Sequence, residues 1–353
     1  MTGYQEPALT KKDFSLTFCQ VISAFAVATL HTNGRFWDFS ATESYWFSAN
    51  IIESIFYFAV PVFFMITGIT LADYKERYST KTFFKKRIEK TLIPYIVWSL
   101  LAFVFLFATG TLKPEDITPS WIIISLIWTS NIVAYYWFFG ALFAFYLLMP
   151  FIASIDKDQK LKVFKYLIIF IFICNVTLFF ILKLFGLYPE VIDTSGIGFS
   201  NIIFVLLGYY IYKKPPVRSA KIAIYILAVI GLLVHMVGTY LLSMKAGEVN
   251  EMLKGYANFP SVLYSLGVFV LLRDIAAKIE KIDWLRKFIE LLGKYTFEVF
   301  LLHWFVINLT GLFITIDDKN LLYRLLFPLF IYAVTVIVTW LLRKIPVIRK
   351  IVP

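Results

Sequence analysis

Residues 60–95 read VPVFFMITGITLADYKERYSTKTFFKKRIEKTLIPY, and this stretch decides the fold. An apolar run ends near Ala72, a basic segment follows, and a second apolar run opens around Pro94. Short loops rich in lysine and arginine stay on the cytoplasmic side of a membrane. The stretch therefore predicts two membrane spans joined by a cytoplasmic loop. Seven cations lie in that loop: Lys75, Arg77, Lys81, Lys85, Lys86, Arg87 and Lys90.

Composition extends this prediction to the whole chain. Hydrophobic residues make up 60% of the 353 residues and charged residues only 16%. A soluble protein of this length could not bury so much apolar surface, so lipid must cover much of it. The net charge of +11 comes from cations in short loops between apolar runs, which indicates topology and not nucleic-acid binding. Cys19 and Cys174 lie in apolar runs, so we expect neither a disulfide nor a thiolate metal site.

Ten spans fit the pattern of apolar runs and basic loops, which predicts an all-α polytopic membrane bundle with both termini in the cytoplasm. In this arrangement 26 of the 34 lysines and arginines are cytoplasmic and seven are outside, as the positive-inside rule requires. Residues 121–129 are apolar but too short to cross, so we expect an interfacial or re-entrant helix on the outer side. The expected spans are residues 13–33, 46–72, 91–110, 133–154, 164–185, 199–213, 220–243, 259–273, 289–314 and 321–343.

The three histidines, His31, His235 and His303, all fall within predicted spans. An ionisable group there is costly and is a functional candidate, and histidine is the natural proton-transfer group. His31 ends the first span and Glu53 starts the second at a similar depth, so we expect Glu53 to orient the His31 ring. Glu298 lies deeper, five residues before His303, so these two do not share a helix face. The alternatives are a neutral histidine that only joins helices, which we favour for His235, and a glutamate in contact with water.

The end of the basic loop predicts an anion site. Lys86 and Lys90 share a face of a continuous helix, with Arg87 beside them and Lys85 adjacent. Grouped arginine and lysine suit phosphate oxygens, although topology alone would also explain these cations. The sequence has no nucleotide-binding loop and no HExxH, GxSxG or CxxC pattern. We therefore expect no metal and no chemistry of the soluble hydrolases.

Six blocks along the chain resemble the acyltransferase-3 family of membrane proteins, which O-acylate bacterial surface polysaccharides and related acceptors. Each block alone is weak, but their order on a ten-span frame is specific. The resemblance implies one membrane domain over residues 1–353. The blocks are FCQVISAFAVATLH (residues 18–31), VPVFFMITG (60–68), FFKKRIEKTLIPY (83–95), YYWFFGALFAFYLLMP (135–150), LLGYYI (206–211) and LGKYTFEVFLLH (292–303).

The resemblance also implies roles for particular residues. His31 matches the histidine taken as catalytic, and Arg87 with its neighbours matches the basic motif near the acyl-CoA site. Trp137 and His303 match other recurring positions, and we expect both to bind substrate. Tyr135 and Glu298 are expected to join them.

The sequence departs from the family pattern at three positions. Family members usually carry arginine at the position of Gln20, often with aspartate at the position of Thr17. Tyr135 stands where histidine is common. These departures leave open a divergent acceptor or a bundle with another activity.

We therefore expect a multi-pass O-acyltransferase of the bacterial inner membrane that moves an acetyl group from cytoplasmic acetyl-CoA to a hydroxyl of an extracytoplasmic glycan or cell-wall acceptor. His31 is the expected general base and Glu53 its orienting acid. Lys85, Lys86, Arg87 and Lys90 are the expected phosphate contacts. Acyl-CoA, the acceptor and the lipid bilayer are the expected partners, and nucleic acid is not. The alternative is a transporter or flippase of a small metabolite or glycan precursor, and a membrane scaffold is a weaker one.

Overall fold

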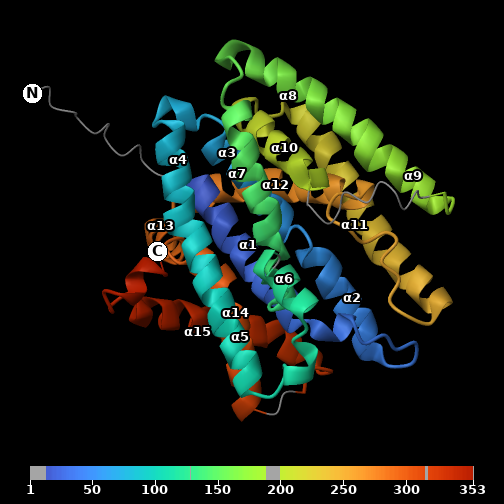
Figure 1. The fold of residues 1–353 in the computed structure, drawn as a ribbon. Coiled ribbons are helices and arrows are strands. Elements are labelled where there is room, and N and C mark those ends of the chain that lie inside the picture. The colour runs from blue at the N-terminus through green and yellow to red at the C-terminus, as the bar shows by residue number, and fades with distance from the viewer. Residues whose placement is uncertain (1–12, 128, 188–198, 315–316, 353) are drawn as a thin grey trace, which may run out of the picture.

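The computed structural model describes residues 13–127, 129–187, 199–314 and 317–352. Every regular element among them is a helix, and the helices pack into one bundle (Figure 1). The predicted all-α polytopic class is therefore confirmed. The main elements are α1 (Phe14–Thr32), α2 (Ser44–Phe56), α3 (Ala59–Leu71), α4 (Thr80–Arg87), α5 (Ile93–Ala108), α6 (Pro119–Ile127), α7 (Trp137–Ile152), α8 (Lys157–Ile171), α9 (Leu178–Leu184), α10 (Ile202–Lys213), α11 (Arg218–Ala246), α12 (Phe259–Ile279), α13 (Asp283–Leu292), α14 (Thr296–Phe313) and α15 (Leu321–Leu342).

Eight helices or helical runs of the described residues are long and apolar enough to cross a membrane. Three of them join shorter elements: α2 with α3, α4 with α5, and α8 with α9. The sequence predicted ten spans, and eight of the described helices or helical runs meet the length and composition of a span. Helix α10 has only 12 residues, and α12 also stands outside the set of eight. The cytoplasmic location of both termini stays a prediction.

Prolines and π-helical turns shape the longer runs. Helices α2 and α3 separate at Tyr57, because Pro61 has no N–H to donate to the Tyr57 carbonyl. Helix α4 joins α5 through a π-helical turn at Ile88–Leu92, just before Pro94. Such turns often occur at functional sites. This one directly follows Arg87 and breaks the regular helical register there.

Predicted cytoplasmic segments meet at one end of the bundle, which we call the basic end. The Asp73 carboxylate accepts a hydrogen bond from Lys160 Nζ at 2.8 Å and pairs with Lys213 Nζ at 3.1 Å. The Tyr209 hydroxyl donates to the same carboxylate at 2.9 Å. Lys160 is 4% exposed, so this network ties α8 and α10 firmly to the end of α3.

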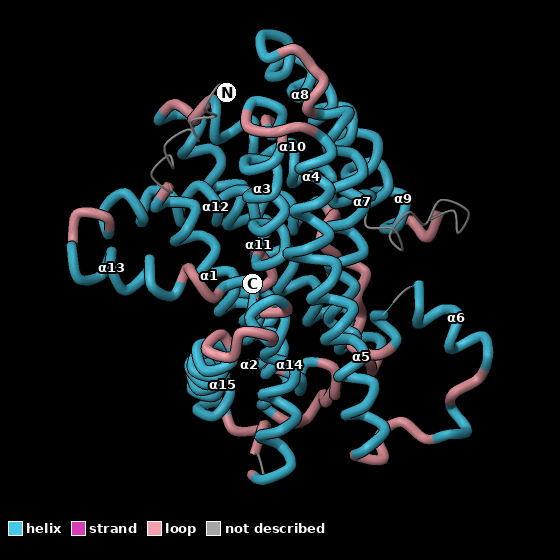
Figure 2. Tube along the Cα trace, turned by 60° about the vertical axis from the view of Figure 1, so that its left-hand side comes forward, coloured by secondary structure: helices cyan, strands magenta, loops and turns pink. Residues whose placement is uncertain are grey.

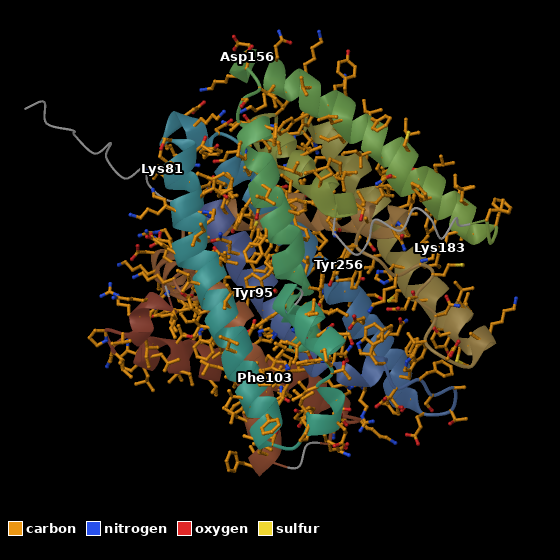
Figure 3. The ribbon with its side chains drawn as sticks, in the orientation of Figure 1. Lys81, Tyr95, Phe103, Asp156, Lys183 and Tyr256 are labelled. Atoms are coloured by element: carbon orange, nitrogen blue, oxygen red, sulfur yellow. The ribbon has the colours of Figure 1, made fainter. Side chains whose placement is uncertain are left out.

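Predicted outer segments meet at the opposite end. Arg35 Nε donates to Asp318 at 2.6 Å and so joins the loop after α1 to the segment before α15. In Figure 3, Lys81 lies at the basic end and Phe103 toward the opposite end. The contacts at both ends agree with the predicted alternation of segments.

Helices α3 and α10 touch through their backbones in the middle of the bundle. A Cβ atom on Gly68 would lie 2.0 Å from the Val205 carbonyl oxygen, and one on Gly208 would lie 2.3 Å from that of Met65. Small residues permit such approach between membrane helices. Gly68 and Gly208 belong to two of the six blocks of the sequence, so close packing is the physical reason for glycine at these positions.

Helices α6 and α13 lie at the periphery and project from opposite sides of the bundle in Figure 2. Helix α6 has nine residues and exposes Ile122, Ile123 and Ile124, as a short element in contact with lipid would. Helix α13 exposes Trp284 and is separated from α14 by a turn. The span expected at 289–314 therefore begins only at Thr296.

Candidate active site

His31, at the end of α1, meets His303 in α14. His31 Nδ1 lies 2.6 Å from His303 Nε2, and the two ring planes differ by only 8°. His303 is fully buried, whereas His31 keeps some exposure. The structure thus brings together two of the predicted site residues across most of the chain length.

The hydrogen bonds of this pair determine which nitrogen atoms carry protons. His303 Nδ1 lies 2.8 Å from the Val299 carbonyl oxygen, which can only accept, so Nδ1 donates. Nε2 of a neutral His303 is then an acceptor, and His31 Nδ1 donates to it. His31 Nε2 is left with its lone pair, which is the form that a general base requires.

Tyr135 covers one face of the His31 ring. The two ring centroids are 3.4 Å apart and the planes differ by 4°. The neighbouring Tyr136 donates its hydroxyl to the Leu301 carbonyl at 2.8 Å, which fastens the start of α7 to α14. Tyr135 and His303 together hold the plane of the His31 ring.

A buried arginine fixes the end of α1. Asn33, two residues after His31, donates from Nδ2 to the Ala49 carbonyl at 2.8 Å. Arg324 Nη1 lies 3.5 Å from the Asn33 side-chain oxygen and 3.1 Å from the Tyr45 carbonyl oxygen. Arg324 is fully buried, and the sequence analysis did not single it out as a site residue. Its signal was an arginine inside an otherwise apolar run.

Glu53 does not make the expected contact with His31. Its Oε1 pairs with Lys254 Nζ at 2.9 Å, and the two side chains are 6% and 4% exposed. Lys254 Nζ also lies 4.0 Å from the ring centre of Trp37. The buried Lys254 ammonium group needs an opposite charge, which Glu53 supplies. His31 Nδ1 does not need Glu53, because His303 already accepts its hydrogen bond. Glu53 is therefore the partner of Lys254, which corrects the predicted orienting role.

Trp137 belongs to an aromatic stack beside the Glu53–Lys254 pair. Its ring lies 5.3 Å from that of Tyr256, which in turn lies 4.3 Å from that of Tyr57. Burial raises the pKa of Tyr256, and the charge of Glu53 adds to this effect. The role of Trp137 in binding substrate stays a prediction.

Glu298 and His235 have other surroundings. Glu298 forms an ion pair with Arg343, near the end of α15. His235 meets the Tyr57 ring edge-on at 4.8 Å, and its Nδ1 has no hydrogen-bond partner among the described residues. Neither of them contacts the His31–His303 pair in the part of the chain that the structure describes.

A cavity of about 170 Å³ extends from the basic end toward this histidine pair. Arg87 lines it, with its guanidinium 5.5 Å from the ring centre of Tyr146, and its Nε has no hydrogen-bond partner among the described residues. Gln20, at the position where the family usually has arginine, also lines this cavity. The remaining lining residues are Phe63, Ile66, Thr67, Thr70, Leu71, Phe138, Leu142, Tyr146, Thr296, Phe297 and Phe300.

The other three predicted phosphate contacts do not line the cavity. Lys85 has a side chain 72% exposed and pairs with Glu89 at 3.8 Å. Lys86 Nζ lies 4.2 Å from the ring centre of Tyr78, and Lys90 is exposed. The predicted shared face assumed a continuous α-helix, and the π-helical turn after Arg87 removes that register.

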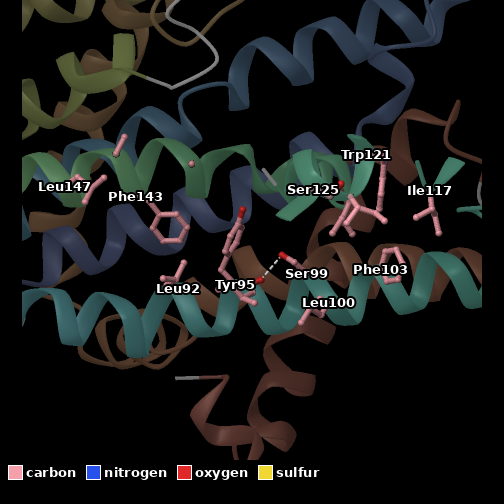
Figure 4. Close-up of a pocket in the computed structure, with 15 residues that line it drawn as sticks. Leu92, Tyr95, Ser99, Leu100, Phe103, Ile117, Trp121, Ser125, Phe143 and Leu147 are labelled. Carbon is pink, nitrogen blue, oxygen red and sulfur yellow. Dashed lines mark hydrogen bonds between the residues drawn. The ribbon is translucent and has the colours of Figure 1, made fainter. Parts of the chain in front are cut away.

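A larger groove of about 750 Å³ lies between α5, α6 and α7 (Figure 4). Its walls are mostly apolar, and the Ser99 hydroxyl donates to the Tyr95 carbonyl of its own helix at 2.7 Å. Leu100 and Leu147 of this groove are 56% and 66% exposed on the outside of the bundle. The groove shares no lining residue with the Arg87 cavity.

Comparison with known families decides the class of the protein. A family model described as an acyltransferase domain, that of the acyltransferase-3 family, matches residues 13–344. The chain belongs to the acyltransferase-3 family. It is a membrane acyltransferase, and the predicted resemblance is confirmed. No curated protein and no solved structure matches the chain.

Proposed function

We propose that this acyltransferase-3 protein transfers an acetyl group from cytoplasmic acetyl-CoA to a hydroxyl of an extracytoplasmic glycan or other cell-surface acceptor in the bacterial inner membrane. The observation that carries the proposal is the chain of hydrogen bonds from His31 to His303 to the Val299 carbonyl. It leaves His31 Nε2 unprotonated, and the Phe300 ring, which lines the cavity at Arg87, lies 6.2 Å from the His303 ring.

The proposed reaction needs one base and one cationic site. The acceptor hydroxyl oxygen attacks the thioester carbonyl carbon while its proton passes to His31 Nε2. The tetrahedral intermediate collapses, the C–S bond breaks, and the imidazolium returns the proton to the departing CoA thiolate. His303 accepts the hydrogen bond from His31 Nδ1 throughout the reaction and so stabilises the imidazolium. The sequence analysis expected Glu53 to have this role.

The phosphates of the donor remain at the basic end in this proposal. Arg87 supplies a guanidinium with an unpaired Nε at the cavity, and charged donors of this kind bind phosphate strongly. Lys85, Lys86 and Lys90 surround it on α4 and the following turn and add positive charge. The acyl end then extends inward, past Thr67 and Thr296, toward the histidines.

The test is the fate of the thioester. Purified protein in liposomes receives acetyl-CoA and a glycan extract of bacterial cell envelopes, and free thiol and glycan-bound acetyl are measured. We expect both to rise together. Acetyl-CoA that stays intact under these conditions would contradict the proposal and favour the transporter or flippase alternative.

A further inference from the structure

Three phenylalanine rings close the Arg87 cavity on the side of the histidines. Phe63 comes from α3, Phe138 from α7 and Phe300 from α14, and all three line the cavity. The Phe138 and Phe300 centroids are 4.6 Å apart, and Phe63 lies 6.1 Å and 6.2 Å from them. We call this triangle the aromatic partition.

The aromatic partition borders His303, the residue that holds the proposed base His31. The Phe300 ring lies 6.2 Å from the His303 ring, so the wall of the cavity at Phe300 is next to the histidine pair. Phe300 is 5% exposed and Phe138 is 7% exposed. Because such rings are closely packed, they cannot move aside for a larger ligand without a cost in free energy.

The cavity lining changes in character along its length. Toward the basic end each of the three helices adds at least one lining residue with a polar group, beside apolar ones such as Leu71 and Phe297. The polar groups belong to Thr67 and Thr70 on α3, Tyr146 on α7 and Thr296 on α14. On α7 the step from Phe138 to Tyr146 is about 12 Å. The polar end suits the amides and phosphates of a CoA donor, and the aromatic end suits its acyl group.

Volume limits what this aromatic end can hold. The cavity has about 170 Å³, and pockets that enclose drug-sized ligands have roughly 300–1,000 Å³. The 750 Å³ groove would hold a long chain, but no lining residue is common to both spaces. Among the described residues, the groove therefore does not continue the Arg87 cavity as a space for a long acyl chain.

We propose that the aromatic partition sets the length of the acyl group, so that Phe63, Phe138 and Phe300 are specificity-determining residues that admit two-carbon groups and exclude chains of four carbons and more. The inference rests on the proposed transfer from acyl-CoA. A single methylene that does not fit an apolar pocket is worth on the order of tenfold or more in rate. Acetyl and butyryl groups differ by two methylenes, so removal of one ring should shift the butyryl-to-acetyl selectivity by at least about tenfold.

The experiment measures thiol release from acetyl-, butyryl- and hexanoyl-CoA by the full-length protein in liposomes. The variants are Phe300→Ala and, as a smaller change at the same wall, Phe138→Leu. Phe305→Ala is the matched control, because Phe305 lies on the same helix but packs against Trp98 at 5.2 Å and does not line the cavity. Gel filtration shows that each variant is folded.

We expect the wild type to prefer acetyl-CoA over butyryl-CoA by at least about tenfold. Phe300→Ala should raise the butyryl-to-acetyl ratio by about the same factor, and Phe138→Leu should raise it less. Phe305→Ala should leave the ratio unchanged. An unchanged ratio in both folded partition variants, or equal use of hexanoyl- and acetyl-CoA by the wild type, would overturn this inference alone. If the wild type consumes no acyl-CoA, both this inference and the proposed function fall.

Discussion

The Arg87 cavity and the groove between α5, α6 and α7 are both hollows in a membrane bundle, yet their walls differ in chemistry. The cavity is the smaller, at about 170 Å³ against 750 Å³, and an arginine, three threonines and five aromatic residues line it. The groove offers hydrocarbon almost throughout. Charged groups inside a membrane are costly and mark functional paths, whereas lipid chains can fill an apolar groove. The Arg87 cavity is therefore the candidate site on the chemistry of its walls, although the groove is larger.

The largest expected effect concerns the packing of α10 against α3, the helix that carries Phe63, Thr67 and Thr70 of the cavity lining. Gly208→Ala places a Cβ 2.3 Å from the Met65 carbonyl oxygen, and backbone atoms cannot rotate away as side chains do. We expect a loss of at least roughly 3 kcal/mol, the upper end for overpacking, and hence little folded protein. The measurement is the melting temperature in detergent.

Gly311→Ala is the matched control for this variant, because nothing lies within 4 Å of a Cβ at that position. It should keep or slightly raise the melting temperature, since alanine favours a helix by up to about 1 kcal/mol over glycine. Equal melting temperatures for the two variants would mean that α3 and α10 are not in backbone contact.

The next effect concerns the orientation of the base. His303→Ala removes the acceptor for His31 Nδ1, so the imidazolium is no longer steadied and the reactive tautomer is no longer selected. We expect kcat to fall by about 10²-fold with a small change in KM. His303→Asn should recover part of the loss, because the amide oxygen can accept the same hydrogen bond. Equal activity of the Ala and Asn variants would argue against this positioning role.

A smaller effect is expected for donor binding. Arg87→Met should weaken acetyl-CoA binding by about tenfold, which corresponds to one charge-assisted contact with phosphate. The affinity of the wild type should also fall as salt rises, and less steeply in the variant. Lys81→Met, an exposed cation on the same helix, is the control and should bind like the wild type. Equal losses of acetyl-CoA affinity in the two variants would mean that Arg87 contributes only general positive charge to the cytoplasmic loop.

The smallest effect is expected at the groove. Leu100→Trp partly fills it at a lipid-exposed position, and we expect thiol release from acetyl-CoA within about twofold of wild type, because surface changes of this kind seldom exceed 0.5 kcal/mol. A tenfold loss in a well-folded Leu100→Trp protein would contradict the contrast between the two hollows.

The sequence predicted the class of fold for physical reasons, and it singled out residues that the structure brings together. Apolar runs and basic loops reveal a membrane bundle because the bilayer imposes them. Histidines in spans are rare enough to be noticed, and His31 and His303 do meet. The cation of the basic loop that lines the cavity, Arg87, was also among the predicted contacts.

Other features could not be predicted, because they depend on which helices are neighbours. The sequence places Glu53 and His31 at a similar depth in the membrane, but the Glu53 carboxylate pairs with the buried Lys254. The π-helical turn at Ile88–Leu92 changes which cations face inward, and no simple period reveals it. The three phenylalanines of the partition are ordinary apolar residues until α3, α7 and α14 bring them together.

The most direct test of the account compares His31→Gln with the wild type in two assays, acetyl-CoA binding and thiol release in the presence of the envelope glycan extract. Glutamine keeps a polar side chain at the end of α1 but cannot take up a proton. We predict binding within about twofold and a transfer rate lower by at least about 10²-fold. Transfer at the wild-type rate in this variant would contradict the assignment of His31 Nε2 as the base.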